Sequence, residues 1–448
     1  MGDEIRPRVL LEANAGRLAR VEPLAMEVAP PAGTRVLSGL TLPGLANVHS
    51  HAFHRALRGR CQEPESGGSD FWGWRRRMYA LAGFLDPEQY FELCRAALGE
   101  MALAGVAAVG EFHYLHHRPG GAPYSRPEME EALVAAASEA GVRLTLLDTC
   151  YLRPGFGVDQ LQGAARRFGD GTAAAWARRA ERLVETDTLR RGAAIHSVRA
   201  VDPASMRQVG AWARERGAPL HLHLSEQPEE NRDCLQATGM TPTELVQAAE
   251  VLGPGTTAIH AIHLSPEDIA RLGSSETTVC ACPTTERDLG DGVCPAAELA
   301  RAGSRLCLGS DSNAVTDLFE EARALELDLR LVSHRRGGIA AQELLRAASG
   351  HGMAALGWDS GELCRGRLAD FATLELQSPR LAGAGVADLV PRTVFGATAA
   401  DVSSLVVGGR EVVRDGHHLG LGSVAERLET ALEALEPAWS RAVEEVTG

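Results

Sequence analysis

Pro43-Gly44-Leu45-Ala46-Asn47-Val48-His49-Ser50-His51 is a short apolar run that ends in two histidines. Side chains two residues apart on a β-strand lie on the same face, so His49 and His51 are expected to point the same way. Two imidazoles at the end of a rigid strand are a natural half of a metal site. A His-x-His pair alone is a weak signal, because many such pairs are only hydrogen-bonded. Other strands must supply the remaining ligands.

This run is the first of eight that alternate with amphipathic stretches such as Pro87–Leu103 and Pro203–Arg216, a pattern typical of parallel strands separated by helices. The eight predicted strands are Gly44–His51, Val106–Tyr114, Val142–Cys150, Ala193–Val198, Pro219–Leu224, Thr257–His263, Thr277–Cys282 and Ser304–Asp311. Polar residues gather where the runs end, and the active sites of (β/α)8 barrels are built at that face. An α/β fold with a closed TIM barrel is therefore favoured over a doubly wound open sheet.

Both chain ends differ from the central part. Val36–Leu40, Leu368–Leu374 and Ser404–Val413 are β-like segments with bends at Gly and Asp, so the two ends are expected to form one small β-sandwich-like domain. We divide the chain into residues 1–42 (first part of the β domain), 43–364 (metal-dependent barrel) and 365–448 (second part of the β domain and a terminal helix). That helix, roughly Val424–Val446, has an apolar stripe, so packing is its expected role.

Composition excludes several classes of function. The formal net charge of −14 argues against binding to nucleic acid. The sequence contains no lysine, so all 45 Lys+Arg residues are arginine, which excludes a Schiff-base lysine and a carboxylated lysine bridging two metals. No export signal or membrane span is evident, and the nine scattered cysteines are typical of reduced thiols. We expect a cytoplasmic protein with no membrane partner; a homodimer is compatible with the terminal helix.

Two further strand ends offer metal ligands. The fifth run contains His221 and His223, of which His223 lies nearer the end of the strand and is the better candidate. The eighth run ends at Asp311, whose carboxylate can coordinate a metal and accept a proton from its water; a helix N-cap is its alternative role. The sequence thus predicts one divalent cation, by default Zn²⁺, held by His49, His51, His223 and Asp311.

Two neighbours could move protons at this site. Glu226 follows the fifth strand and is placed to act as proton shuttle, although a helix-capping or solvated glutamate is the simpler alternative. His260, in the sixth run, could hold the water or the developing charge. Glu226, His260 and Asp311 are therefore the predicted catalytic residues.

These motifs resemble the amidohydrolase superfamily, in its deaminase branch with one metal. The resemblance rests on HSH at 49–51, HLHLSE at 221–226, the histidine of the sixth strand and GSDS at 309–312, and it spans nearly the whole chain. It includes Gly366–Phe371, which is similar to the return strand that follows the barrel in that superfamily. The absence of lysine agrees with a single metal.

Within that branch, Leu42–Ala56 and Phe71-Trp72-Gly73-Trp74-Arg75 are similar to the formimidoylglutamate deiminase family of histidine degradation. Tyr114 and the stretch His196-Ser197-Val198-Arg199 resemble substrate-contact positions of that family. Two positions depart from its pattern. His54 stands where glutamine is usual, and Asn313 stands where histidine often follows Ser-Asp-Ser.

The resemblance implies hydrolysis of N-formimidoyl-L-glutamate to N-formyl-L-glutamate and ammonia. This substrate is a small dianion, and guanidinium groups pair well with carboxylates. Arg199 and Arg75 are the expected anchors, helped by Tyr114 and His196, with His54 as a further contact; surface ion pairing is the alternative role of both arginines. A deaminase of a nucleobase or another ring, and a barrel that only binds its ligand, are the competing functions. The aromatic segment Gly67–Met78 could be a lid or a fixed plug over the site.

Overall fold

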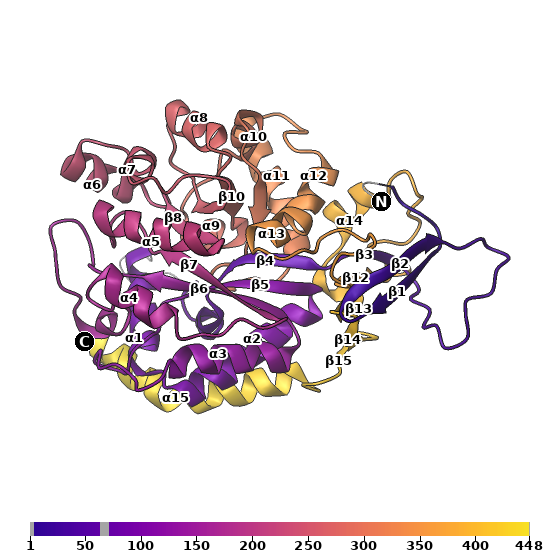
Figure 1. Ribbon diagram of the computed structural model, residues 1–448, viewed down its shortest axis with the longest axis horizontal. Helices are drawn as coiled ribbons and strands as arrows, with labels where there is room; N and C mark the ends of the chain where they lie inside the picture. Colours follow the sequence, from indigo (N-terminus) through magenta and orange to yellow (C-terminus); the bar gives the residue numbers. More distant parts are fainter. Residues whose placement is uncertain (1–3, 63–70, 448) are drawn as a thin grey trace.

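The computed structural model describes residues 4–62 and 71–447. Eight parallel strands, neighbours in the order β11-β10-β9-β8-β7-β6-β5-β4, form the centre of the molecule (Figure 1). Their bounds are β4 Leu45–Ser50, β5 Val106–His113, β6 Arg143–Cys150, β7 Leu189–Ile195, β8 Leu220–Leu224, β9 Thr256–His260, β10 Thr278–Ala281 and β11 Leu306–Leu308. Each of the eight predicted runs contains or overlaps one of these strands, which confirms the barrel and excludes the open sheet.

A single β-bridge joins the first and the last strand of the barrel. Ser50 pairs in parallel with Asp311, the amide of His51 donates to the carbonyl of Asp311 (2.9 Å), and the amide of Asp311 donates to the carbonyl of His49 (2.9 Å). Gly309 permits this approach, because a Cβ at that position would lie 2.7 Å from the Cβ of His49. This closing contact between β4 and the segment after β11, here called the seam, therefore includes three of the predicted metal ligands: His49, His51 and Asp311.

Helices cover the outside of the barrel, and their starts are readable in the sequence (Figure 1). Asp86 caps α2 in a capping box with Gln89, and Pro87 and Pro203 open α2 and α5. Both of these helices have the bounds predicted from the sequence. The α-helices are α1 Phe71–Phe84, α2 Pro87–Leu103, α3 Glu128–Ala140, α4 Ala173–Ala180, α5 Pro203–Arg216, α6 Pro228–Thr238, α7 Pro242–Ala248, α8 Pro266–Ser274, α9 Pro283–Leu289, α10 Ala296–Ala302, α11 Leu318–Ser333, α12 Ala341–Ala347, α13 Gly350–Ala355, α14 Leu389–Gly396 and α15 Val424–Thr447.

Three strands of the barrel, β7, β9 and β11, differ from their predicted bounds by three residues or more at one end or both. β9 ends at His260 rather than at His263, because His260 and Ala261 have a left-handed backbone. β7 begins at Leu189, four residues before the predicted start, because its first residues include the polar Arg190 and Arg191, which lie outside the apolar run. The guanidinium group of Arg190 lies over the ring of Trp358, 4.7 Å from the centroid. β11 ends at Leu308 rather than at Asp311, because the backbone leaves the extended conformation beyond Gly309 and Asp311 has a φ of 44°.

A second, antiparallel sheet combines both ends of the chain, as expected. Its order is β15-β14-β13-β12-β3, with bounds β3 Leu40–Pro43, β12 Phe371–Leu374, β13 Val402–Val407, β14 Arg410–Arg414 and β15 His417–His418. Its N-terminal strand, however, is Leu40–Pro43 and not the predicted Val36–Leu40, because Gly39, with φ 145°, interrupts the segment just before the pairing with β12 begins. A separate hairpin, β1 Val9–Asn14 and β2 Arg17–Pro23, packs Leu18 against Phe371 and Val406 of this sheet. The predicted strand Ser404–Val413 is two strands, split by a turn at Gly408 and Gly409. The domain boundaries given above remain our proposal.

The last helix, α15, runs along one side of the barrel and packs on α1 and α2 (Figure 1). Leu428, Leu435 and Trp439 of its apolar stripe are buried there, in agreement with the packing role. Within residues 4–62 and 71–447, no helix combines the length and the apolar character needed to cross a membrane. None of the nine cysteines, all of which lie in the described residues, forms a disulfide bond, and all except Cys364 are buried.

Candidate active site

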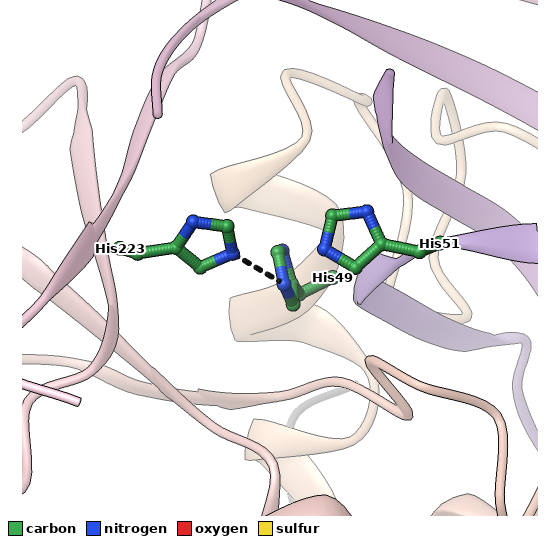
Figure 2. Close-up of side chains that lie close together, drawn as sticks. All are labelled: His49, His51 and His223. Carbon is green, nitrogen blue, oxygen red and sulfur yellow. Dashed lines mark hydrogen bonds between the residues drawn. The ribbon is translucent and has the colours of Figure 1, made fainter. Parts of the chain in front are cut away.

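Three histidines from two strands point at one another at the carboxyl end of the barrel (Figure 2). His49 and His51 belong to β4 and the residue after it, and His223 belongs to β8. The Nε2 atoms of His49 and His223 are 3.1 Å apart. All three side chains are buried, so the sequence-predicted histidines do come together.

Asp311, three residues after the end of β11, and His260, the last residue of β9, complete this cluster. Oδ1 of Asp311 lies 3.4 Å from Nε2 of His49 and 3.5 Å from Nε2 of His51, and its Oδ2 lies 3.7 Å from Nε2 of His260. Both residues have a left-handed backbone, with φ 44° for Asp311 and 68° for His260. Strained backbone at non-glycine residues is common at functional sites, where the surrounding structure enforces it.

The donor set suits a divalent cation. Nδ1 of His51 donates to the carbonyl of Phe112 (3.0 Å), and Nδ1 of His223 donates to the carbonyl of His196 (2.8 Å). The Nε2 atom of each ring therefore keeps its lone pair, which faces the cluster. Burial, followed by the charge of neighbouring histidines, holds the pKa of the His51 and His223 imidazoles well below 6.5, so both rings are neutral near neutral pH. Among the described residues, Nε2 of His260 is buried without a hydrogen-bond partner. These side chains therefore fit a metal ion at their centre.

The remaining histidines of the fifth and sixth strands point elsewhere. Nε2 of His221 donates to the carbonyl of Ala355 (3.1 Å), one layer below the cluster. Nε2 of His263 donates to the carbonyl of Asp291 (2.9 Å). The choice of His223 and His260 from the sequence thus agrees with the geometry, while their roles remain proposals.

Glu226 and His260 face each other beside the cluster, with Oε1 of Glu226 3.8 Å from Nε2 of His260. Burial raises the pKa of Glu226, and Asp311 adds to this, although the charge of His260 opposes it. Burial would lower the pKa of His260, but Glu226, Glu286 and Asp311 together raise it to about 10. A buried carboxyl with a raised pKa beside a charged histidine is suited to proton transfer.

His196 lies next to His223, with ring centroids 5.2 Å apart, and two arginines lie near His196. Nε of Arg199 donates to Oε2 of Glu230 (3.0 Å), and only 12% of the Arg199 side chain is exposed. Arg75 of α1 donates to the hydroxyls of Tyr79 (2.7 Å) and Tyr151 (3.4 Å). Burial, and then the charges of Arg199 and Arg75, hold the pKa of the His196 ring well below 6.5, so both guanidinium groups act on this ring.

His54 and Tyr114 form a pair beside His51, with Nε2 of His54 2.9 Å from the Tyr114 hydroxyl, and the Tyr114 ring also lies 6.1 Å from that of His196. Burial lowers the pKa of His54 to about 3, so the ring is neutral. The ring of Trp74 packs edge-on against His54, with centroids 5.2 Å apart. Of the segment Gly67–Met78, residues 67–70 lie outside the described residues, and the remainder begins α1 and covers this part of the site.

Several residues around the site were not predicted from the sequence. Glu286 of α9 holds Nδ1 of His260 (3.3 Å), Glu230 of α6 holds Arg199, and Asn47 accepts the amide of Ser310 (2.9 Å). Glu230 and Glu286 lie in the first turns of helices, where acidic residues are common for electrostatic reasons. No signal in the sequence alone separates these two carboxylates from ordinary first-turn residues.

A TIM barrel with buried histidines and an aspartate at the carboxyl ends of its strands defines a metal-dependent barrel hydrolase. The chain belongs to the amidohydrolase family, whose model matches residues 40–412. It is an enzyme that hydrolyses C–N bonds, which disfavours the alternative of a barrel without catalytic activity.

Individual relatives share most of their length with this chain. Formimidoylglutamate deiminase of Pseudomonas aeruginosa is 36% identical over 92% of this chain and 95% of its own. 8-Oxoguanine deaminase of the same organism is 30% identical over 95% and 94%. The crystal structure of an amidohydrolase from Brucella melitensis superposes with a TM-score of 0.85 at 31% identity, covering 95% of this chain and 96% of the other.

Proposed function

We propose that this enzyme hydrolyses the formimidoyl group of N-formimidoyl-L-glutamate to give N-formyl-L-glutamate and ammonia. The observation that carries the proposal is that Arg75 and Arg199 both lie close enough to His196 to act on its charge, and that the His196 ring contacts His223 of the proposed metal ligands (the metal-ligand cluster). The 36% identical deiminase supports it.

The substrate would bring two carboxylates into this part of the site. Placing two guanidinium groups near one ring costs electrostatic energy unless an anion neutralises them. Glu230 fixes the Nε edge of Arg199, and two tyrosine hydroxyls fix Arg75, so both planar groups are pre-oriented. A dicarboxylate fits this charge, whereas a flat neutral base does not use it.

We propose that His49, His51, His223 and Asp311 hold one divalent cation, with Zn²⁺ as the first candidate because its usual ligands are nitrogen and carboxylate donors. When bound, such an ion supplies Lewis acidity that lowers the pKa of water toward neutrality.

The residues around the cluster provide the proton path. Asp311 and His260 hold the attacking water, and Glu286 fixes the orientation of His260. Glu226 accepts one proton of the water as its oxygen bonds to the formimidoyl carbon, and passes it to the terminal NH group, which becomes NH2. It then takes the second proton from the new C–OH group and delivers it to this NH2 group, which leaves as ammonia while the formyl C=O forms. Water thus adds its oxygen to the product, and the C–N bond to ammonia breaks.

We also assign the enzyme to histidine degradation in the cytoplasm, acting on a small anionic substrate and without nucleic acid or a membrane as partner. The net charge of −14 and the mostly buried cysteines, none of which forms a disulfide bond in the described residues, support this assignment. A homodimer remains compatible with it.

Ammonia release from a panel of substrates tests the function. N-Formimidoyl-L-glutamate should be turned over with the highest kcat/KM, ahead of formimidoylaspartate, 8-oxoguanine, guanine and cytosine. Arg199→Gln should raise KM for formimidoylglutamate at least about tenfold, because a charge-assisted anchor is lost. Arg207→Gln, on the exposed part of α5, serves as the matched control and should have no effect. A nucleobase turned over in preference to formimidoylglutamate would refute the proposal.

A further inference from the structure

A second buried cluster of charged side chains lies where α3 and α4 meet the ends of β5 and β6, apart from the metal-ligand cluster. Its centre is Glu130 of α3, whose Oε1 lies 2.8 Å from Nδ1 of His116 and 2.9 Å from Nη1 of Arg179. Arg179 also binds Asp148 (2.7 Å) and Asp170 (2.8 Å). Glu130 and His116 are at most 1% exposed.

The geometry identifies this cluster as an ion network rather than a metal site. Nε2 of His116 faces the carbonyl of Thr149 (2.9 Å), and its Nδ1 faces the carboxylate of Glu130. Both ring nitrogens of His116 are engaged by these partners, so neither faces the cluster as a free metal ligand. Arg179 contacts the same Oε1 of Glu130 as His116 does, so that oxygen already has two side-chain partners.

The network fixes the chain on both sides of Tyr114. Of the two flanking histidines, His116 binds Glu130 directly and His113 places its Nε2 3.5 Å from the same carboxylate oxygen. Nε2 of His117 lies 3.1 Å from Oδ1 of Asp170. Tyr114 itself points the other way, to His54. The position of the Tyr114 hydroxyl therefore depends on the contacts that the neighbouring histidines make with Glu130 and Asp170.

The same network supports the aromatic side chains that orient Arg75. Arg179 holds Asp170, two residues after Phe168. The Phe168 ring packs against Tyr114 (centroids 5.0 Å apart), Tyr151 (5.6 Å) and Tyr79 (5.6 Å). The last two tyrosines accept hydrogen bonds from Arg75. One network thus lies behind two of the proposed substrate contacts.

We propose that Glu130 and Arg179 are positioning residues for substrate binding, which set Tyr114 through His113 and His116, and Arg75 through Phe168 and the two tyrosines. The inference rests on the proposed function, in which Tyr114 and Arg75 contact the substrate. It predicts that a loss of charge in the network weakens substrate binding without removing the metal or the proton path.

Glu130→Gln tests this, because glutamine keeps the size of the side chain and removes its charge. We expect KM for formimidoylglutamate, and the Kd of the product N-formyl-L-glutamate measured by calorimetry, to rise at least about tenfold, since small displacements of binding groups are costly. The kcat should stay within about threefold, because Glu226, His260 and Asp311 are untouched. Metal content, measured by mass spectrometry, should not change.

Asp370→Asn is the matched control. Asp370 binds Arg143 with two hydrogen bonds (2.8 and 2.9 Å) in an equally buried pair at the opposite end of β6. This variant should lose stability while KM stays at the wild-type value. If Asp370→Asn raised KM as much as Glu130→Gln, the effect would be general destabilisation and the inference would fail.

A double-mutant cycle with Tyr114→Phe separates positioning from a structural role. If Glu130 acts through Tyr114, the two effects on KM should be clearly less than additive. Full additivity, an unchanged KM in a folded Glu130→Gln variant, or loss of a second equivalent of metal in that variant would each overturn the inference. Should Glu130→Gln not fold, His116→Gln makes the same test. The cycle can use whichever substrate the wild type accepts, so failure of the proposed substrate remains distinguishable.

Discussion

At the scale of single residues, each functional side chain depends on a partner behind it. Glu286 stands behind His260, Glu230 behind Arg199, and the Phe112 carbonyl behind His51. Such partners fix which nitrogen faces the reaction and at what angle, and their loss commonly costs as much as the loss of a direct contact. Predictions about single residues therefore concern both the group that acts and the group that holds it.

Replacing Glu226 with glutamine should lower kcat by about 10²–10⁴, because the amide cannot carry the proton. The metal content should stay at the wild-type level, since Glu226 is not among the four proposed ligands. Activity is measured by ammonia release and metal by elemental analysis. Glu229→Gln, a half-exposed glutamate three residues along the chain, is the control. A Glu226→Gln enzyme with nearly full activity would remove Glu226 from the mechanism.

Replacing His54 with glutamine should leave KM within a few-fold of wild type, because the glutamine amide can also pair with the Tyr114 hydroxyl. His54→Ala should raise KM, since it leaves a buried hydroxyl without its partner at a cost of about 1–3 kcal/mol. Steady-state kinetics compares the two variants. Equal KM values for His54→Ala and wild type would show that this hydrogen bond does not bear on binding.

The metal-ligand cluster was readable in the sequence because strand periodicity and strand ends locate side chains. His49 and His51 share a face by alternation, and His223 was separated from His221 by depth alone. Glu230 and Glu286 were not found, because their role comes from contacts between helices and strands far apart along the chain. His54 was found only through its resemblance to a family position.

At the scale of elements, the meeting of β4 and β11 decides whether the site exists. Asn313 stabilises this seam: its Nδ2 donates to the carbonyls of His51 (3.0 Å) and Asp311 (3.2 Å), and its Oδ1 accepts from Ser310 (2.6 Å). Asparagine also tolerates the left-handed backbone at this position, where φ is 55°. The departure from histidine at position 313 thus has a structural account.

Asn313→Gly and Asn313→Ala should both destabilise the protein. Glycine accepts the positive φ, so its cost of about 1–3 kcal/mol in the free energy of unfolding reflects the lost hydrogen bonds. Alanine should cost about 1–2 kcal/mol more, because of backbone strain. Metal occupancy should fall in both variants, since the backbone of two ligands is released. Denaturant unfolding and elemental analysis provide the measurements, and wild-type values for Asn313→Ala would contradict this account.

Elements with strong local signals were predicted closely. Pro87–Leu103 and Pro203–Arg216 carry their own start signals in a proline and a capping aspartate. The start of β7 was missed because Arg190 stacks on Trp358, a contact 168 positions away that no local pattern contains. Local chemistry sets helix ends, whereas tertiary contacts set strand ends.

At the scale of the whole molecule, buried carboxylates tie the barrel to its helices and make stability sensitive to acid. Burial opposes ionisation of Glu130, but His113, His116 and Arg179 hold its pKa well below 4.5. The pKa of Asp170 is lowered by His117 and Arg179 and that of Asp311 by the surrounding histidines, in each case against the effect of burial. In the folded protein these three carboxyls therefore stay ionised at pH values at which the same groups already bind protons in the unfolded chain.

The stabilisation contributed by these three carboxyls should consequently be fully present above about pH 4.5 and be lost steadily as the pH falls toward their folded-state pKa values. The unfolded state binds more protons in this window, so the free energy of unfolding decreases with falling pH. Glu130→Gln should show a shallower decrease, because one of these carboxyls is gone. Urea unfolding between about pH 6 and pH 3 gives both slopes. Parallel slopes for variant and wild type would contradict the assignment.

The contacts between β4 and β11 also limit when the site can form during synthesis and folding. Asn313 and His51, which these contacts join, are 262 positions apart, and contacts across such separations form late because the entropy of the intervening chain opposes them. His49 and His51 leave the ribosome long before Asp311. A nascent chain that lacks the last barrel strand thus has three of the four proposed ligands, His49, His51 and His223, but no enclosed site, so under this proposal the metal site is completed only when Asp311 joins the barrel.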